Sequence, residues 1–134
     1  MPVATSSLLQ VPLVQRLLPA GKRVGIITAE ARSLTRAHLD AVGVDPATPI
    51  AGMPEGGNFA RTFLGNHPQL DRDAVQNELI DAGRKLLADH PDIGAVVLEC
   101  TNLPPYARAL HQALGLPVYD VLTMLRWFQA GLRP

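Results

Sequence analysis

The single cysteine of the chain stands where a strand-like run gives way to a turn. Cys100 follows the apolar run 95–98 and Glu99, and Thr101 and Asn102 come directly after it. A thiolate can act as a base and a thiol as an acid, so Cys100 is the first candidate for chemistry. The hydroxyl of Thr101 and the amide of Asn102 can both donate hydrogen bonds to a carboxylate.

A helix is expected after this turn, because Pro104 and Pro105 suit the first positions of a helix. The unpaired N–H groups and the positive dipole end of such a helix favour an anion. We therefore predict that Cys100 has a lowered pKa and that a substrate carboxylate docks beside it on Thr101 and Asn102. The competing interpretation is a small, buried and inert cysteine, and position alone favours neither.

Three further hydroxyl groups are candidates for substrate binding. Thr28 ends the apolar run 24–27, and Ser6 and Ser7 follow an extended stretch near the N-terminus. Each hydroxyl can donate a hydrogen bond to an anion. Capping of the next helix explains the two serines equally well.

Metal and cofactor sites are not expected. One cysteine excludes a multi-thiolate cluster, and none of the four histidines pairs with another one helical turn away. The glycines form neither the GxGxxG dinucleotide fingerprint nor a GK[ST] phosphate loop.

The elements that position these residues alternate along the chain. Short, continuously apolar runs are typical of parallel strands covered on both faces, and they are separated here by stretches with helical spacing. The pattern predicts an α/β fold, a small parallel sheet flanked by helices on both faces. We expect strands at 24–29, 48–52, 95–100 and 117–120, and helices at 9–18, 34–42, 71–90, 107–114 and 121–130.

Ligands of open parallel sheets bind beyond the carboxyl ends of the strands, where the strand order reverses. With the first strand in the centre, this crevice lies between the ends of the first and third strands. The prediction places Thr28, Ala29 and Glu30 on one side, and Glu99, Cys100, Thr101 and Asn102 on the other.

Composition narrows the classes of function. The chain has 134 residues, and its 12 basic and 12 acidic side chains give a formal net charge of +0. This size fits one domain or one lobe, and a neutral chain offers no basic face to nucleic acid or an anionic membrane. Pro12 and Arg16 interrupt the apolar start, which excludes a membrane span there. The single cysteine favours a reducing compartment, so we expect a cytoplasmic protein.

Two motifs carry a resemblance to a known family. The stretch LECTNLPPYA at 98–107, followed at a helix's distance by GLPVYD at 115–120, resembles the aspartate/glutamate/hydantoin racemase superfamily. Residues 22–29 are similar to the strand that opens the second lobe of that family, and residues 2–7 to the strand that closes the first.

The resemblance implies a particular division of the chain. Residues 21–134 would form a flavodoxin-like second lobe, preceded at 1–20 by a strand–helix remnant of the first lobe. The exposed cleft side of such a lobe should be apolar, so we expect self-association into a homo-oligomer.

The family's chemistry is cofactor-independent inversion at a carbon next to a carboxylate, with one cysteine from each lobe. By this resemblance Cys100 is the second-lobe cysteine, and Thr101 and Asn102 hold the carboxylate of an amino acid or derivative. The 134 residues hold no counterpart of the first-lobe cysteine. A racemase-type enzyme is the main expectation. The alternatives are a single-cysteine decarboxylase or isomerase of the same superfamily, and a non-catalytic anion-binding or assembly lobe.

Overall fold

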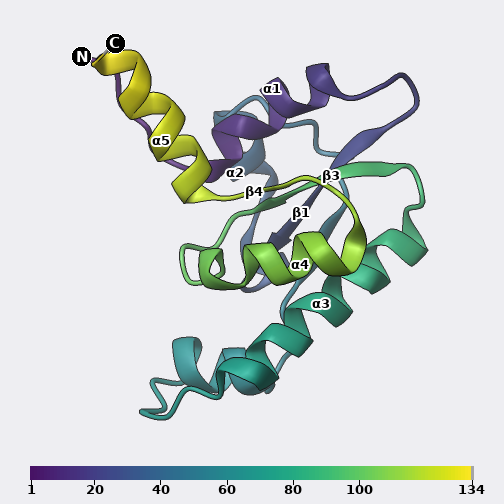
Figure 1. The fold of residues 1–134 in the computed structure, drawn as a ribbon, viewed down its shortest axis with the longest axis vertical. Helices are drawn as coiled ribbons and strands as arrows, with labels where there is room; N and C mark the ends of the chain where they lie inside the picture. The colour runs from purple at the N-terminus through teal and green to yellow at the C-terminus, as the bar shows by residue number, and fades with distance from the viewer. Residues whose placement is uncertain (134) are drawn as a thin grey trace.

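Four short parallel strands form the centre of the molecule (Figure 1). A computed structural model describes residues 1–133. The strands follow the order β2-β1-β3-β4, and the predicted α/β fold with a small parallel sheet is confirmed. Their bounds are Arg23–Thr28 for β1, Ile50–Gly52 for β2, Ile93–Leu98 for β3 and Val118–Tyr119 for β4. The two longest strands, β1 and β3, are central, as their continuous hydrophobicity requires.

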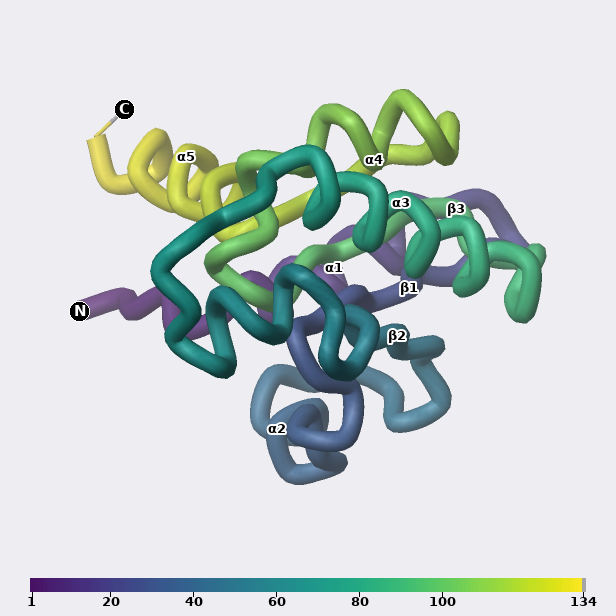
Figure 2. Tube along the Cα trace, turned by 90° about the horizontal axis from the view of Figure 1, so that it is seen from below, coloured from purple at the N-terminus to yellow at the C-terminus, as the bar shows by residue number. Residues whose placement is uncertain are grey.

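Helices cover both faces of this sheet. Alternate residues of a strand point to opposite faces, so Val97 packs in one apolar cluster while Val96 and Leu98 pack in another. The first cluster includes α1 (Gln10–Leu17) and α2 (Arg36–Ala41). The second includes α3 (Arg72–Asp89) and α4 (Ala107–Leu114), which lie along the same side of the sheet (Figure 2).

Several helix boundaries follow from capping residues visible in the sequence. The Asp71 side chain accepts a hydrogen bond from the N–H of Ala74 at 3.0 Å, as an N-cap does. At the end of α4, Gly115 adopts a left-handed conformation with φ 67° that favours glycine. The short elements are the 3₁₀ turns η1 (Ser7–Leu9), η2 (Ala31–Ser33) and η4 (Pro104–Tyr106), and the π-helical turn η3 (Ala60–Leu64).

The last helix, α5 (Val121–Leu132), extends away from the sheet beside the N-terminal segment (Figure 1). Asp120 caps its start, and within the helix only Met124 is buried. Across residues 1–133, no helix combines the length and the apolar character needed to cross a membrane.

The strand expected near the N-terminus is absent. Residues 1–6 have no regular secondary structure, and Ser7 begins a 3₁₀ turn. A strand exists only when a neighbouring strand satisfies its backbone groups, and the ladder of this sheet contains only the four strands above. The extended sequence at 2–7 therefore stays outside the sheet.

A set of side-chain hydrogen bonds joins the N-terminal segment to the rest of the fold. The amide of Gln10 donates to the carbonyls of Ser7 and Asp120, at 3.2 and 2.9 Å, and accepts from the Thr123 hydroxyl at 3.0 Å. The buried Ser7 hydroxyl in turn donates to the carbonyl of Leu98, at 2.9 Å. The start of α5 is thus connected through Gln10 and Ser7 to the end of β3.

Candidate active site

The carboxyl ends of β1 and β3 lie side by side, as the predicted crevice requires. Ile27 pairs with Leu98, and the N–H of Glu99 donates to the Ile27 carbonyl at 2.8 Å. One residue further along β1, the buried Thr28 hydroxyl donates to the carboxylate of Glu99 at 2.6 Å. The candidate residues of the two strands therefore meet at one edge of the sheet.

A cleft of about 610 Å³ opens at this edge, on the side of the sheet that α2 covers. The Thr28–Glu99 pair lies in its wall. Its lining residues come from the N-terminal segment, the end of β1, the segment that follows it and α2: Thr5, Ser6, Leu8, Thr28, Ala29, Glu30, Ser33, Leu34, Ala37, His38, Ala41 and Val42, with Leu64 and Glu99. The predicted site residues Thr28 and Ser6 thus line the cleft.

Cys100 lies at the same edge but on the other side of the sheet. It is half-buried and packs against the apolar cluster beneath α3 and α4, which includes Leu103 and Tyr106. Successive residues of an extended chain point to opposite faces, so Glu99 lines the cleft while Cys100 does not. The thiol and the cleft are adjacent through the backbone rather than through a shared cavity.

The predicted lowering of the Cys100 pKa is wrong. Burial raises the pKa of the thiol above its ordinary value, because water no longer stabilises the thiolate. The N–H and the side chain of Asn102 hydrogen-bond the sulfur and lower its pKa, while the negative charge of Glu99 raises it. Burial and the Glu99 carboxylate together outweigh Asn102.

The turn after Cys100 uses several of its N–H groups within the backbone. The N–H of Leu103 donates back to the Cys100 carbonyl at 3.1 Å, and that of Tyr106 to the Leu103 carbonyl at 3.0 Å. The 3₁₀ turn η4 therefore separates the thiol from α4 and occupies donors that the prediction assigned to an anion.

The other predicted binding residues differ in their surroundings. Thr101 and Asn102 are exposed directly beside Cys100, and the Asn102 side chain also hydrogen-bonds its sulfur. Ser6 accepts a hydrogen bond from the N–H of Leu8 at 3.1 Å, which is the capping role, and also lines the cleft. Ser7 is buried, and its hydroxyl donates to the Leu98 carbonyl at the end of β3.

Sequence reasoning did not predict that Glu78 on α3 holds the loop at Asn58 and Phe59 by hydrogen bonds. Its carboxylate accepts hydrogen bonds from the N–H groups of Asn58 and Phe59, at 2.6 and 3.0 Å, and from the Asn58 amide at 2.8 Å. Burial acts to raise the pKa of Glu78, but these bonds outweigh it and hold the pKa below its ordinary value. A Cβ on Gly57 would meet this carboxylate at 2.9 Å, so the glycine permits the close approach.

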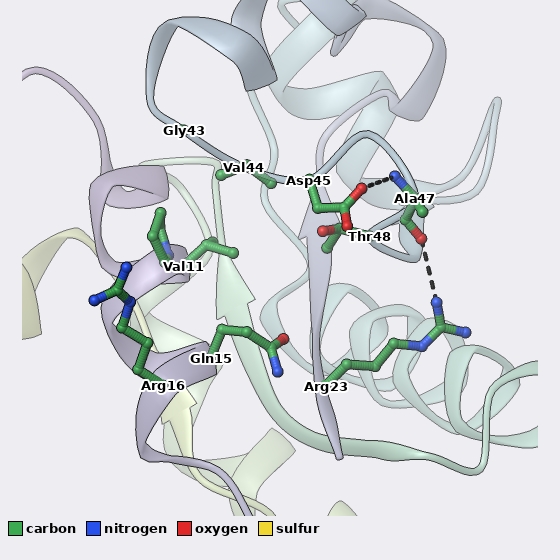
Figure 3. A pocket seen from close by; sticks show the side chains of 10 residues that line it. Val11, Gln15, Arg16, Arg23, Gly43, Val44, Asp45, Ala47 and Thr48 are labelled. Atoms are coloured by element: carbon green, nitrogen blue, oxygen red, sulfur yellow. Dashed lines mark hydrogen bonds between the residues drawn. The ribbon is translucent and has the colours of Figure 1, made fainter. Parts of the chain in front are cut away.

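A second cleft, of about 500 Å³, lies at the opposite end of β1 (Figure 3). Arg23, in its wall, donates to the Ala47 carbonyl at 3.2 Å and forms an ion pair with Asp92 at 2.6 Å. Arg23 also contacts His90, at 3.1 Å. The guanidinium therefore already has protein partners, and none of the predicted site residues lines this cleft.

Comparison with known protein families identifies the family of this chain. Residues 8–128 match the Asp/Glu/Hydantoin racemase family. The match spans the whole sheet and the turn that carries Cys100. The chain belongs to this family.

Two relatives of the chain are named as lyases. The racemase-family chain is 31% identical to dimethylsulfoniopropionate lyase of Durusdinium sp. clade D, over 97% of its own length and 44% of the relative's. It is 32% identical to dimethylsulfoniopropionate lyase 7 of Emiliania huxleyi (strain CCMP1516), over 98% and 41% of the two chains. The chain thus spans less than half the length of these relatives.

Solved structures support the fold of the family. The crystal structure of allantoin racemase from Pseudomonas fluorescens superposes with a TM-score of 0.62 at 16% identity. The match covers 93% of this chain and 50% of the racemase. At this identity the likeness establishes the architecture and leaves the reaction to be argued from the site.

Proposed function

We propose that this racemase-family protein catalyses a lyase reaction at a carbon next to a carboxylate, with Cys100 as a proton-transfer group. The observation that supports a site at Cys100 is that this residue stands beside exposed Thr101 and Asn102. The relatives that are named as lyases favour a lyase reaction over racemisation.

The substrate class that we propose is a small carboxylate with a leaving group on the carbon beyond the acidic one, such as dimethylsulfoniopropionate. The Cys100 thiolate removes a proton from the carbon next to the carboxylate. The electron pair of that C–H bond becomes a carbon–carbon double bond as the carbon–sulfur bond breaks. Dimethyl sulfide leaves with its bonding pair, acrylate remains, and the thiol returns its proton to solvent.

Thr101 and Asn102 are proposed to hold the substrate carboxylate. Negative charge grows on that carboxylate as the proton leaves, and donors aimed at it stabilise the transition state. The hydroxyl of Thr101 and the amide of Asn102 are exposed next to the thiol and can supply two such donors. Thr28 and Ser6 line the cleft on the other side of the sheet, so their part in substrate binding remains a prediction.

The raised pKa of the thiol gives this proposal a pH signature. A base with a pKa above its ordinary value is mostly protonated at neutral pH, so the rate should increase with pH until the thiol has ionised. Asn102→Ala removes a group that lowers the pKa and should move the rise in rate to higher pH.

The decisive experiment incubates the protein with dimethylsulfoniopropionate and measures dimethyl sulfide in the headspace and acrylate by NMR. We expect both products in equal amounts from the wild type and none above background from Cys100→Ala. Equal product from Cys100→Ala, with native circular dichroism, would overturn the role of the thiol. Absence of product from the wild type would overturn this substrate.

A parallel NMR experiment in heavy water distinguishes racemisation from the lyase reaction. With amino acids as substrates, a racemase replaces the hydrogen next to the carboxylate by deuterium without releasing a second product. Exchange that depends on Cys100 would favour racemisation. Failure of both assays would favour a non-catalytic anion-binding or assembly lobe.

The compartment and the ligand class of the protein are also proposals. We propose a cytoplasmic protein that binds a small carboxylate, because the chain is electrically neutral and has one unpaired cysteine. The division into a first-lobe remnant at 1–20 and a second lobe at 21–134 remains a prediction about the family's two-lobed architecture.

A further inference from the structure

The carboxylate of Glu99 is half-buried in the wall of the cleft beside Thr28. The Thr28 hydroxyl donates to it at 2.6 Å, which satisfies one acceptor site with a neutral group and leaves the charge in place. Within residues 1–133, none of the ion pairs includes Glu99. A charge that is partly removed from water is unfavourable unless an opposite charge lies nearby. This carboxylate is therefore suited to a cationic ligand.

The other carboxylate of the cleft already has a partner of opposite charge. Glu30 forms an ion pair with Arg32 at 2.6 Å and accepts a hydrogen bond from the Ser33 hydroxyl. These two contacts, the one from Ser33 first, hold the pKa of Glu30 below its ordinary value and keep the carboxylate ionised. The charge of Glu30 is thus balanced within the protein, whereas that of Glu99 is not.

The side chains that line the cleft offer no positive charge to an anion. Among the lining residues in the described part of the chain there is no Lys or Arg, and the basic side chain present is His38. Its Nδ1 atom accepts a hydrogen bond from the N–H of Thr35 at 3.0 Å, so this nitrogen carries no proton and the ring is neutral. The lining therefore has a negative charge, which disfavours an anionic ligand.

The rest of the cleft wall is mainly apolar. Its apolar side chains include Leu8, Leu34, Ala37, Ala41, Val42 and Leu64. Within residues 1–133, no three His, Cys, Asp or Glu side chains are grouped so as to hold a metal ion. An apolar wall suits methyl groups, which lose little by leaving water, better than it suits a strongly hydrated cation. A single carboxylate beside such a wall fits a cation whose charge is surrounded by carbon.

We propose that this cleft binds a small organic cation with a methylated onium group, held by the carboxylate of Glu99. Thr28 is the positioning residue, because its hydroxyl donates its hydrogen to Glu99 and fixes the direction of the carboxylate. The methyl groups of the ligand pack against the side chains of α2. The sulfonium compound proposed above as a substrate belongs to this chemical class, but the inference rests on the cleft alone.

The test is a titration of the isotope-labelled full chain with choline, followed by amide NMR. We expect saturable shifts of amide signals along the cleft, at Thr28, Ala37 and Leu64. The control ligand is the alcohol in which a carbon atom replaces the charged nitrogen of choline. It has the same shape and no charge, so it should bind at least about tenfold more weakly.

Three variants locate the effect, with circular dichroism as a check of folding. Glu99→Gln removes the charge but keeps an oxygen that can accept the Thr28 hydroxyl, and should weaken choline binding about tenfold. Asp40→Asn is the matched control, because it removes a negative charge from α2 outside the cleft lining and should change affinity by less than about twofold. Ala37→Lys introduces a positive charge at an exposed position in the lining and should also weaken binding, which provides a second test if Glu99→Gln does not fold.

Three outcomes would overturn the proposal. A wild-type protein without saturable shifts would show that the cleft does not bind this class of cation. Equal affinity for choline and its uncharged analogue would show that the charge is not recognised. Unchanged choline binding in a folded Glu99→Gln or Ala37→Lys would place the ligand elsewhere. None of these results bears on the lyase proposal, which is tested by release of dimethyl sulfide.

Discussion

The hydroxyl of Thr28 and the carboxylate of Glu99 form a hydrogen bond of 2.6 Å that joins the ends of the two central strands. Thr28 is 4% exposed, so its hydroxyl has little access to water as an alternative partner. The bond lies in the wall of the cleft and holds the residue that precedes Cys100. Strand pairing and the geometry of the candidate site therefore depend on the same contact.

Replacement of Thr28 tests this contact. Thr28→Val keeps the shape of the side chain but removes the donor, and the free energy of unfolding should fall by about 1–3 kcal/mol. Thr28→Ser keeps the hydroxyl, so it should retain the bond and lose only the packing of a methyl group. Urea unfolding of both variants measures the difference, and an equal loss for the two would assign the effect to packing.

Alkylation of Cys100 tests its raised pKa. Because the chain has one cysteine, the rate of reaction with iodoacetamide reports this thiol alone. The midpoint of the rate against pH should lie above the ordinary value of 9.0. At pH 7 less than about 1% of the thiol should then be ionised.

Two variants separate the causes of that shift. Glu99→Gln removes a negative charge that disfavours the thiolate, so the midpoint should move to lower pH. Asn102→Ala removes a hydrogen bond that favours the thiolate, so it should move to higher pH. A midpoint that is unchanged in both variants would contradict the electrostatic account.

Glu78 should make the free energy of unfolding depend on pH in the acid range. Its pKa in the folded protein lies below the ordinary value of 4.5, so the unfolded chain binds a proton more readily. The stabilisation from Glu78 is complete at pH values above its pKa in the unfolded chain. It is lost as the pH falls through the pKa of Glu78 in the folded protein. Glu78→Gln should therefore unfold more easily at pH 7, by about 1–3 kcal/mol, and should show a weaker loss of stability in acid.

The control for this experiment is Glu55→Gln. The Glu55 side chain is 78% exposed and has only a distant ion pair with Arg32, at 3.4 Å. Its removal should change the free energy of unfolding by less than about 1 kcal/mol. If the stability of Glu78→Gln had the same pH dependence as the wild type, the bonds to Asn58 and Phe59 would not be its source.

A pair of glycines separates backbone conformation from packing. Gly115 has φ 67° and Gly131 lies in α5, and a Cβ at either position would meet no atom within 4 Å. Gly115→Ala should therefore destabilise the protein by about 1–2 kcal/mol through its left-handed backbone alone. Gly131→Ala should be neutral or stabilising, by up to about 1 kcal/mol, because alanine is the better helix former. Thermal unfolding of the two variants compares them directly.

Much of the fold could be predicted because local patterns determine it. The strands β1 and β3 have continuous apolar runs, and Asp71 and Gly115 are capping residues whose chemistry fixes the ends of helices. The stretch 2–7 has the composition of a strand but lacks a neighbour to pair with, and that neighbour is a property of the whole fold.

The edge of the sheet that holds the candidate residues could be predicted, but the face on which Cys100 lies and its electrostatics could not. Strand order follows general rules, so the meeting of Thr28 and Glu99 could be anticipated. The direction of the Cys100 pKa depends on how deeply the sulfur is buried and on which N–H groups the turn η4 uses. The role of Glu78 depends on a contact with Asn58, twenty residues away, that no local pattern indicates.

The Gln10 side chain links two distant parts of the molecule. It hydrogen-bonds the Asp120 carbonyl and the Thr123 hydroxyl at the start of α5, and the Ser7 hydroxyl donates to the Leu98 carbonyl at the end of β3. The position of α5 is therefore tied, through two buried or half-buried side chains, to the strand end that precedes Cys100.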